Sequence, residues 1–295
     1  MMGKENFVHK GTPFAVNVHS EESLNYAENE FPVLDDDIFN VTYPKSGTNW
    51  MIEILNLIKY KGDTTMSNRV PIYERSPWYE TIFGKEQVKA LNHPRIISSH
   101  LPYHMFAKSF SKSKAKIIYT MRNPKDVFVS NYHFAHALQI FKEPKSLQEH
   151  MDNFLQGNSL YGSWFDHVKG WMQMKEDRRF FYITYEELQQ DLRGCVLRIC
   201  KFLGQELEDE AIDSVVKNSS FKVMKDNKMA NWTTIPSDVL DHSKGSFMRK
   251  GTCLLYLHQK RLMCWSMPLF VLALTTAVPF SVVICVFSLH HCNLL

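Results

Sequence analysis

The sequence predicts an α/β fold: a P-loop-like, three-layer domain with a central parallel sheet flanked by helices. Short apolar runs at residues 38–43, 95–99, 116–121 and 180–184 are typical of buried strands, and a loop and a helical or irregular segment follow each of them. Residues 51–59 have the apolar spacing of a buried helix. The first 250 of the 295 residues also fit one domain, because about 100–250 residues is the usual size.

The first strand is joined to its helix by residues 41–50, Val-Thr-Tyr-Pro-Lys-Ser-Gly-Thr-Asn-Trp. A tight turn before a helix directs several main-chain N–H groups at one point, and the positive end of the helix dipole adds to them. Gly47 permits close approach of the backbone, and Lys45 brings a full charge. The segment predicts a phosphate-binding loop, with an ordinary strand–helix turn and a surface lysine as the alternative.

This loop differs from that of the nucleotide-hydrolysing P-loop proteins. Their pattern G-x-x-x-x-G-K-[ST] is absent, since Lys45 precedes Gly47 instead of following a glycine. No cluster of Asp and Glu suggests a magnesium site beside it. A kinase function is therefore disfavoured, and we predict a reaction without a metal ion.

Other chemically active residues follow the remaining strands. His100, Arg122 and Tyr185 each come just past a predicted strand, as Lys45 does. The carboxyl ends of parallel strands meet at one edge of a sheet, so we expect these residues to converge on one crevice. A histidine in this position is more often a hydrogen-bonded structural residue than a base, and position alone leaves both roles open.

Composition excludes several classes of protein. The net charge is +3 and no long basic run occurs, so a nucleotide-sized anion is a better match than nucleic acid. Cys195 and Cys200 lie in a predicted amphipathic helix, residues 186–203, where buried thiols are common. The polar start lacks an apolar signal core, which predicts a cytoplasmic protein. Residues 1–29 show no firm periodicity and are expected to form a loosely ordered arm.

Residues 41–50 resemble the signature of the cytosolic sulfotransferases, the family that uses 3′-phosphoadenosine 5′-phosphosulfate (PAPS). The resemblance continues through seven further sequence blocks in the family's order: VPIYERSPW (70–78), SSHLP (98–102), KIIYTMRNPKDVFVS (116–130), YGSWFDHVKGW (161–171), YITYEEL (182–188), NSSFKVMKDNKM (218–229) and SFMRKG (246–251). These blocks look most similar to the hydroxysteroid (alcohol) branch, and they place a sulfotransferase domain at residues 30–251.

The resemblance implies roles for individual residues. His100 would be the general base, and Lys45 would stabilise charge on the departing bridging oxygen. Arg122 and Ser130 would hold the 3′-phosphate, and Ser130 would also contact Lys45 and restrain idle hydrolysis of the donor. No metal ligand is implied. The other implied donor-binding residues are Ser46, Gly47, Thr48, Asn49, Trp50, Tyr185, Ser219, Ser220, Phe221, Lys222, Val223, Met224, Phe247, Met248, Arg249, Lys250 and Gly251.

The implied reaction is transfer of the sulfuryl group of PAPS to the hydroxyl of a small lipophilic acceptor: a steroid, alcohol or phenol. Acceptor pockets of the family are apolar and lie beside the histidine. Aromatic residues make up 13% of the chain, so most must belong to the core and the sequence does not identify the acceptor. Candidates for the pocket wall are Tyr79, Phe83, Tyr132, Phe134 and Phe141.

The resemblance ends at Gly251. Residues 252–295 lack the Gly-Asp-Trp-Lys stretch, the last helix and the dimer motif of the family, which puts donor affinity and a homodimer in doubt. Residues 264–289 are 26 residues without a formal charge, more than the roughly 20 that span a bilayer. Lys260 and Arg261 precede them, so a membrane segment here would leave the domain in the cytosol.

Two origins of this apolar tail remain open: a membrane anchor, and a sequence from an alternative exon or unspliced sequence that was never selected for structure. The tail also leaves a second function open. In that alternative the chain is a non-catalytic or membrane-attached isoform that keeps the fold but binds the donor poorly.

Overall fold

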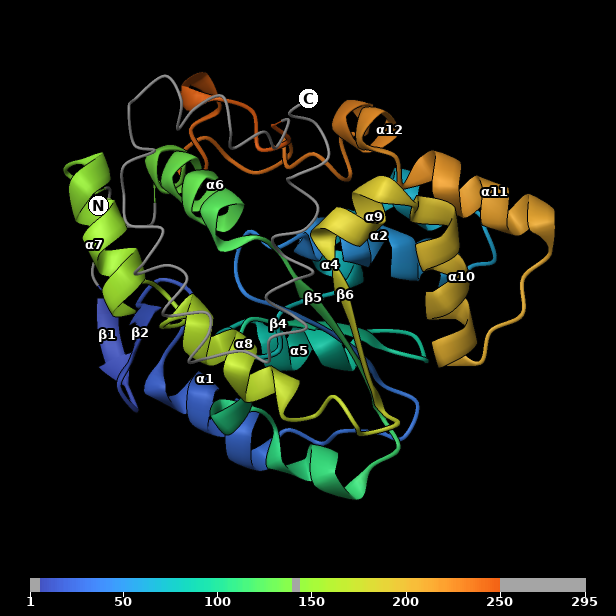
Figure 1. The fold of residues 1–295 in the computed structure, drawn as a ribbon, viewed down its shortest axis with the longest axis horizontal. Coiled ribbons are helices and arrows are strands. Elements are labelled where there is room, and N and C mark those ends of the chain that lie inside the picture. Colours follow the sequence, from blue (N-terminus) through green and yellow to red (C-terminus); the bar gives the residue numbers. More distant parts are fainter. Residues whose placement is uncertain (1–5, 140–143, 250–295) are drawn as a thin grey trace, which may run out of the picture.

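The computed structural model describes residues 6–139 and 144–249. At its centre is a four-stranded parallel sheet in the order β4-β3-β5-β6 (Figure 1). All four predicted strands are present, and two have the predicted bounds. The strands are β3 (Ile38–Thr42), β4 (Ile96–Ser99), β5 (Lys116–Met121) and β6 (Phe180–Thr184).

The strands are mainly apolar and largely buried because both faces of the sheet are covered. Along β5 the side chains alternate between two clusters: Ile117 and Tyr119 pack into an aromatic-rich core on one face, and Ile118 packs into an aliphatic core on the other. Helices lie on either side of the sheet in Figure 1. This three-layer arrangement confirms the predicted fold class.

The aliphatic core lies between the sheet and α2 (Thr48–Lys59), α10 (Leu192–Leu203) and α11 (Asp209–Asn218). The predicted helix over residues 186–203 is interrupted. Asp191 ends α9 (Tyr185–Gln190) and begins α10, where its side chain accepts the Gly194 N–H. A short polar side chain competes with the helix for its N–H groups, so the apolar periodicity did not reveal the break. Cys195 and Cys200 are buried, unpaired thiols on α10, as expected.

The other face carries the aromatic-rich core, where α8 (Trp164–Met172) places Trp171 against β5 and β6. Before α8 come α6 (Pro124–Ala137) and α7 (Leu147–Gln156). The remaining short elements are α3 (Thr65–Arg69), α4 (Ile72–Arg75), α5 (Gly84–Lys89), η2 (Tyr103–Met105), η3 (Lys108–Lys112), α12 (Phe221–Asp226) and η4 (His242–Lys244).

The expectation of a loosely ordered N-terminal arm is wrong for residues 6–29. They form a hairpin of β1 (Asn6–His9) and β2 (Thr12–Ala15), then α1 (Glu21–Asn25) and the π-helical turn η1 (Tyr26–Glu30). Phe14 is fully buried beside Tyr161. Elements of four or five residues are too short to show a periodic pattern, and contacts with the rest of the domain hold them in place.

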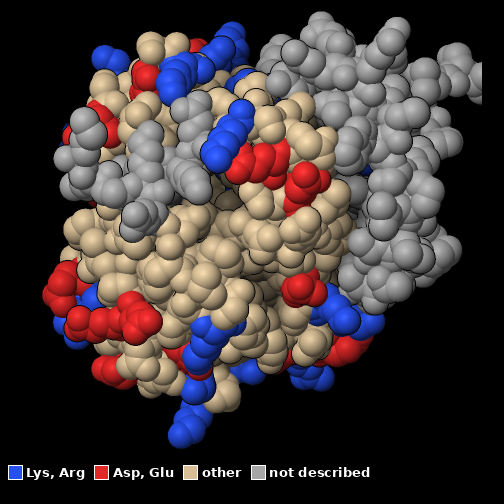
Figure 2. All heavy atoms as spheres, turned by 90° about the vertical axis from the view of Figure 1, so that its left-hand side faces the viewer, with Lys and Arg blue, Asp and Glu red and all other residues tan. Residues whose placement is uncertain are grey.

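The face that contains the hairpin is shown in Figure 2. On it Lys and Arg are interspersed with Asp and Glu, and its described part carries no continuous basic stripe. Among the described helices, none is both long and apolar enough to cross a membrane. Residues 264–289 lie outside the described residues, so the predicted tail and the domain limit at residue 251 stay predictions.

A buried ion pair joins α2 to α4. Arg75 donates to Glu53 at 2.7 Å and to Ser67 at 3.2 Å. The side chains of Arg75 and Glu53 are 0% and 2% exposed. Glu53→Ala would leave the guanidinium buried and unpaired, so we expect the free energy of unfolding to fall by about 3–5 kcal/mol in urea denaturation.

The control is Glu86→Ala on α5, which removes an exposed pair with Lys89 and should leave the urea midpoint almost unchanged. Equal losses in the two variants would contradict a structural role for the buried pair.

Candidate active site

The turn between β3 and α2 has the geometry predicted for a phosphate-binding loop. Lys45 and Gly47 both adopt left-handed backbone conformations, with φ of 71° and 108°. Asn40 donates to the Thr48 carbonyl at 3.1 Å, and the hydroxyls of Thr42 and Thr48 are 2.6 Å apart, so the last residues of the strand hold the first residue of the helix. A Cβ at Gly47 would lie 3.0 Å from Cδ2 of Tyr185. The loop therefore packs tightly against the end of β6.

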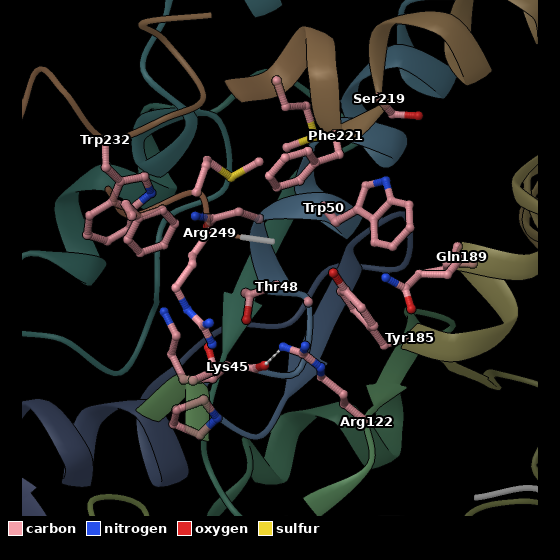
Figure 3. Close-up of a pocket in the computed structure, with 18 of the residues that line it drawn as sticks. Lys45, Thr48, Trp50, Arg122, Tyr185, Gln189, Ser219, Phe221, Trp232 and Arg249 are labelled. Carbon is pink, nitrogen blue, oxygen red and sulfur yellow. Dashed lines mark hydrogen bonds between the residues drawn. The ribbon is translucent and has the colours of Figure 1, made fainter. Parts of the chain in front are cut away.

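A cavity of about 600 Å³ opens at the carboxyl ends of the strands, and the four residues expected to converge all line it (Figure 3). Lys45 follows β3, His100 follows β4, Arg122 follows β5 and Tyr185 follows β6. The other predicted residues that line it are Gly47, Thr48, Asn49, Trp50, Ser130, Ser219, Ser220, Phe221, Met224, Phe247, Met248 and Arg249.

Some predicted donor-binding residues do not line this cavity. Ser46 belongs to the loop but is fully buried. Lys222 and Val223 lie on α12 and do not line the cavity. The sequence predicts that residues 219–224 all bind the donor, but most of them lie on α12, and a helix can present only one face to a ligand. Lys250 and Gly251 lie outside the described residues.

The structure adds lining residues that sequence reasoning missed: Pro44, Trp78, Leu188, Gln189, Leu192 and Trp232. Helical spacing from Tyr185 could have indicated Leu188 and Gln189, which lie three and four residues further on. Trp232 lies in an irregular segment between α12 and η4 and carries no such signal.

Of the four acceptor-wall candidates that the structure describes, one lines the cavity. Phe134 does so from α6. Tyr79 is instead a core residue packed against Phe31 and Phe106, and Phe83 is 60% exposed on the surface. Tyr132 packs against His150 and Phe141 lies outside the described residues. Aromatic type alone did not separate core, surface and cavity.

The loop side of the cavity is strongly cationic. Arg122 donates to the Lys45 carbonyl at 3.1 Å, and its guanidinium lies 4.2 Å from the centre of the Tyr185 ring. Neither Lys45 nor Arg122 forms an ion pair with a carboxylate in the part of the chain that the structure describes. Burial, aided by the charges of Arg122 and Arg249, lowers the pKa of Lys45 to about 7. An anionic ligand would supply the missing negative charge.

Buried polar atoms with no described hydrogen-bond partner gather around the same loop. Most buried polar groups in proteins are paired, so the unpaired atoms that belong to lining residues, on Asn49, Trp50 and Arg122, indicate a place for a ligand. Some of these atoms are N–H donors, which suit the oxygen atoms of phosphate and sulfate. The atoms are Ser46 Oγ, Asn49 Nδ2, Trp50 Nε1, Thr120 Oγ1 and Arg122 Nε.

His100 is held in one orientation by Thr42. Its Nδ1 lies 2.7 Å from the Thr42 carbonyl, which can only accept, so Nδ1 carries the hydrogen and Nε2 carries the lone pair. Nε2 has no hydrogen-bond partner among the described residues. Burial, together with the charge of Lys45, lowers the pKa of His100 to about 4. The imidazole is therefore neutral at pH 7 and able to accept a proton.

Comparison with known proteins identifies the family. Residues 35–257 match the family model described as a sulfotransferase domain. Sulfotransferase 2B1 of Mus musculus is 53% identical over 249 residues, which are 84% of this chain and 74% of that protein. The chain belongs to the sulfotransferase family.

Two further relatives support this. The 3-beta-hydroxysteroid sulfotransferase of Cavia porcellus is 50% identical to our sulfotransferase over 242 residues, 82% of this chain and 84% of that one. The crystal structure of mouse sulfotransferase SULT7A1 complexed with PAP has a TM-score of 0.76 and 29% identity, covering 97% of this chain and 99% of that one. The predicted resemblance, including the hydroxysteroid branch, is confirmed.

The described part of this sulfotransferase contains no group of three or more His, Cys, Asp or Glu side chains placed to hold a metal ion.

Gly47→Ala tests the packing of the loop. The new Cβ would press on Tyr185, and alanine is strained at this φ. We expect the affinity for 3′-phosphoadenosine 5′-phosphate (PAP) to fall by about tenfold or more in calorimetry.

Gly204→Ala is the matched control, since Gly204 also has a left-handed φ, 72°, but nothing lies within 4 Å of its Cβ position. Unchanged PAP affinity in a folded Gly47→Ala variant would show that the loop does not contact the nucleotide.

Proposed function

We propose that this sulfotransferase transfers the sulfuryl group of PAPS to the hydroxyl of a small lipophilic alcohol, with His100 as the general base. One observation carries the proposal. A single cavity is lined both by cationic groups without carboxylate partners, Lys45 and Arg122, and by a neutral imidazole whose Nε2 is free among the described residues. An anionic donor and a hydroxyl acceptor could meet between them.

The enzyme class and the donor predicted from the sequence are confirmed by the family match and by the likeness to a sulfotransferase complexed with PAP, which is PAPS without its sulfuryl group. PAPS supplies an activated sulfuryl group. In our proposal the loop N–H groups, with Thr48 and Asn49, bind its 5′ end, and Arg122 and Ser130 bind its 3′-phosphate.

The adenine of the donor would lie among Trp50, Tyr185 and Met224. The rings of Trp50 and Tyr185 have centroids 5.1 Å apart and are inclined at 69°, and both line the cavity. In Figure 3 the two rings lie close to each other on one side of the cavity, away from Lys45. A flat adenine is suited to an aromatic enclosure of this kind.

The transfer step follows from the residues on either side. His100 Nε2 takes the proton of the acceptor hydroxyl as that oxygen forms its bond to sulfur. The bond from sulfur to the bridging oxygen breaks, its electron pair stays on the 5′-phosphate, and the Lys45 ammonium stabilises the charge that develops there. The products are a sulfate ester, PAP and one proton, so atoms and charge balance.

The acceptor is proposed to be lipophilic because the cavity has aromatic walls on the histidine side. The Trp78 ring centroid is 5.6 Å from that of His100, and the ring of Phe134, on α6, has its centre 3.9 Å from Lys45 Nζ. Trp232 and Phe247 stack at 4.5 Å with an angle of 8°. A relative is named for activity on 3β-hydroxysteroids, which supports a steroid or related alcohol as the acceptor.

Binding of PAP to the full-length protein separates this proposal from a non-catalytic isoform. Calorimetry should detect PAP binding, and Arg122→Ala should weaken it by roughly 10- to 100-fold because charge-assisted bonds to a phosphate are lost. The matched control is Arg198→Ala, whose guanidinium also lies over an aromatic ring, Phe181, but outside the cavity. A folded protein that does not bind PAP would favour the non-catalytic alternative.

His100→Ala should lower the rate of transfer to a hydroxysteroid by about 10²- to 10⁴-fold, while PAP affinity stays unchanged. Because the pKa of His100 is lowered to about 4, its neutral form predominates above that pH. The value of kcat/KM for PAPS, which reports groups of the free enzyme, should therefore fall toward low pH near pH 4 and not near 6.5, measured where circular dichroism shows a folded protein. Retained transfer in His100→Ala would remove His100 from the role of base.

A further inference from the structure

Glu80 is a buried carboxyl that the proposed reaction does not use. It is 0% exposed, and its Oε1 accepts the main-chain N–H of His100 at 2.7 Å. Its Oε2 has no hydrogen-bond partner among the described residues. Burying a carboxyl is costly, so its contact with His100 needs an explanation.

The contact exists because His100 lies where β4 leaves the sheet. The last pair between β3 and β4 joins Val41 to Ser99. On its other side, β4 pairs with residues 77–79. The Ser98 N–H donates to the Pro77 carbonyl at 3.0 Å, and the last bond on this side runs from the Tyr79 N–H to the Ser98 carbonyl. The N–H of His100 thus has no neighbouring strand to bond, and the carboxyl of Glu80 takes the place of a strand carbonyl.

The carbonyl and the ring Nδ1 of His100 are also bonded. His167 Nε2 lies 3.2 Å from the His100 carbonyl, and the Tyr119 hydroxyl lies 2.9 Å from His167 Nδ1. His100 Nδ1 is bonded to Thr42, as described above. Every polar atom of His100 except Nε2 is therefore held by a buried or partly buried partner.

Glu80 is itself anchored from the N-terminal segment. The Ser23 hydroxyl donates to the Glu80 carbonyl at 2.9 Å, and Ser23 forms a capping box with Ser20 at the start of α1. Glu80 thereby connects α1 to the residue proposed as the base.

We propose that Glu80 is a positioning residue for His100: its Oε1 fixes the main chain at residue 100 so that the imidazole presents Nε2 to the acceptor hydroxyl. The inference rests on the proposed role of His100. Burial raises the pKa of Glu80 to about 7, so both protonation states occur near neutral pH. Either state keeps an oxygen that can accept the N–H, and the glutamine side chain keeps one too.

The test compares Glu80→Ala, Glu80→Asp and Glu80→Gln in the full-length protein, with PAPS and a hydroxysteroid as substrates. Glu80→Ala removes the acceptor oxygen and Glu80→Asp shortens the side chain, so both should lower kcat by about 10- to 100-fold. Glu80→Gln should keep kcat within about threefold of the wild type. PAP affinity should be unchanged in all three variants.

Glu28→Ala is the matched control. Glu28 is also a buried carboxyl, 4% exposed, but it pairs with Lys10 and Lys108 away from His100. Its replacement should leave kcat unchanged. If Glu80→Ala does not fold, Glu80→Asp supplies the same comparison.

A double variant shows whether the effect passes through His100. Added to His100→Ala, Glu80→Ala should lower the residual rate by less than about twofold, because there is no imidazole left to position. An equal loss in both backgrounds would overturn the inference, as would wild-type kcat in Glu80→Ala or a Glu80→Gln as impaired as Glu80→Ala. Retained transfer in His100→Ala would instead refute the proposed base, so the two failures are distinguishable.

Discussion

The turn between β3 and α2 places the rest of the site. Thr42, the last residue of β3, bonds to Thr48 at the start of α2 through its hydroxyl and to His100 through its carbonyl. One residue thus holds both the cationic loop and the imidazole, so neither can shift without the other. In an in-line transfer the departing oxygen and the attacking hydroxyl lie on opposite sides of the sulfur, and a shared support for the loop and the imidazole would keep their spacing constant.

Charge in the cavity depends on what occupies it. Nζ of Lys45 lies against the rings of Phe134 and Phe247, 3.9 Å and 4.4 Å from their centres. Aromatic faces stabilise an ammonium group, but burial and two arginines oppose its charge. An anionic donor would remove that opposition and keep Lys45 protonated when it faces the departing oxygen. The charge of the site is therefore completed by its substrate.

Much of the fold and of the loop side of the site could be predicted from the sequence. Strands buried on both faces give continuous apolar runs, and the residue after each strand must lie at one edge of the sheet, which placed Lys45, His100, Arg122 and Tyr185 together. Contacts between distant segments could not be predicted in this way. Trp232 reaches the cavity from an irregular segment, and Tyr79 is drawn into the core by Phe31.

The low pKa of His100 follows from the same environment that makes it useful. Its burial and the nearby charge of Lys45 both disfavour a proton on the ring, so the imidazole that we propose as the base is neutral at pH 7. A proton that reaches Nε2 during transfer would meet the same penalty if the cavity held only cations. In the proposed mechanism a donor bound against Lys45 would offset the part of this penalty that comes from the lysine charge. Proton transfer to His100 would then be more favourable with the donor bound, which would couple deprotonation of the acceptor to the availability of a sulfuryl group.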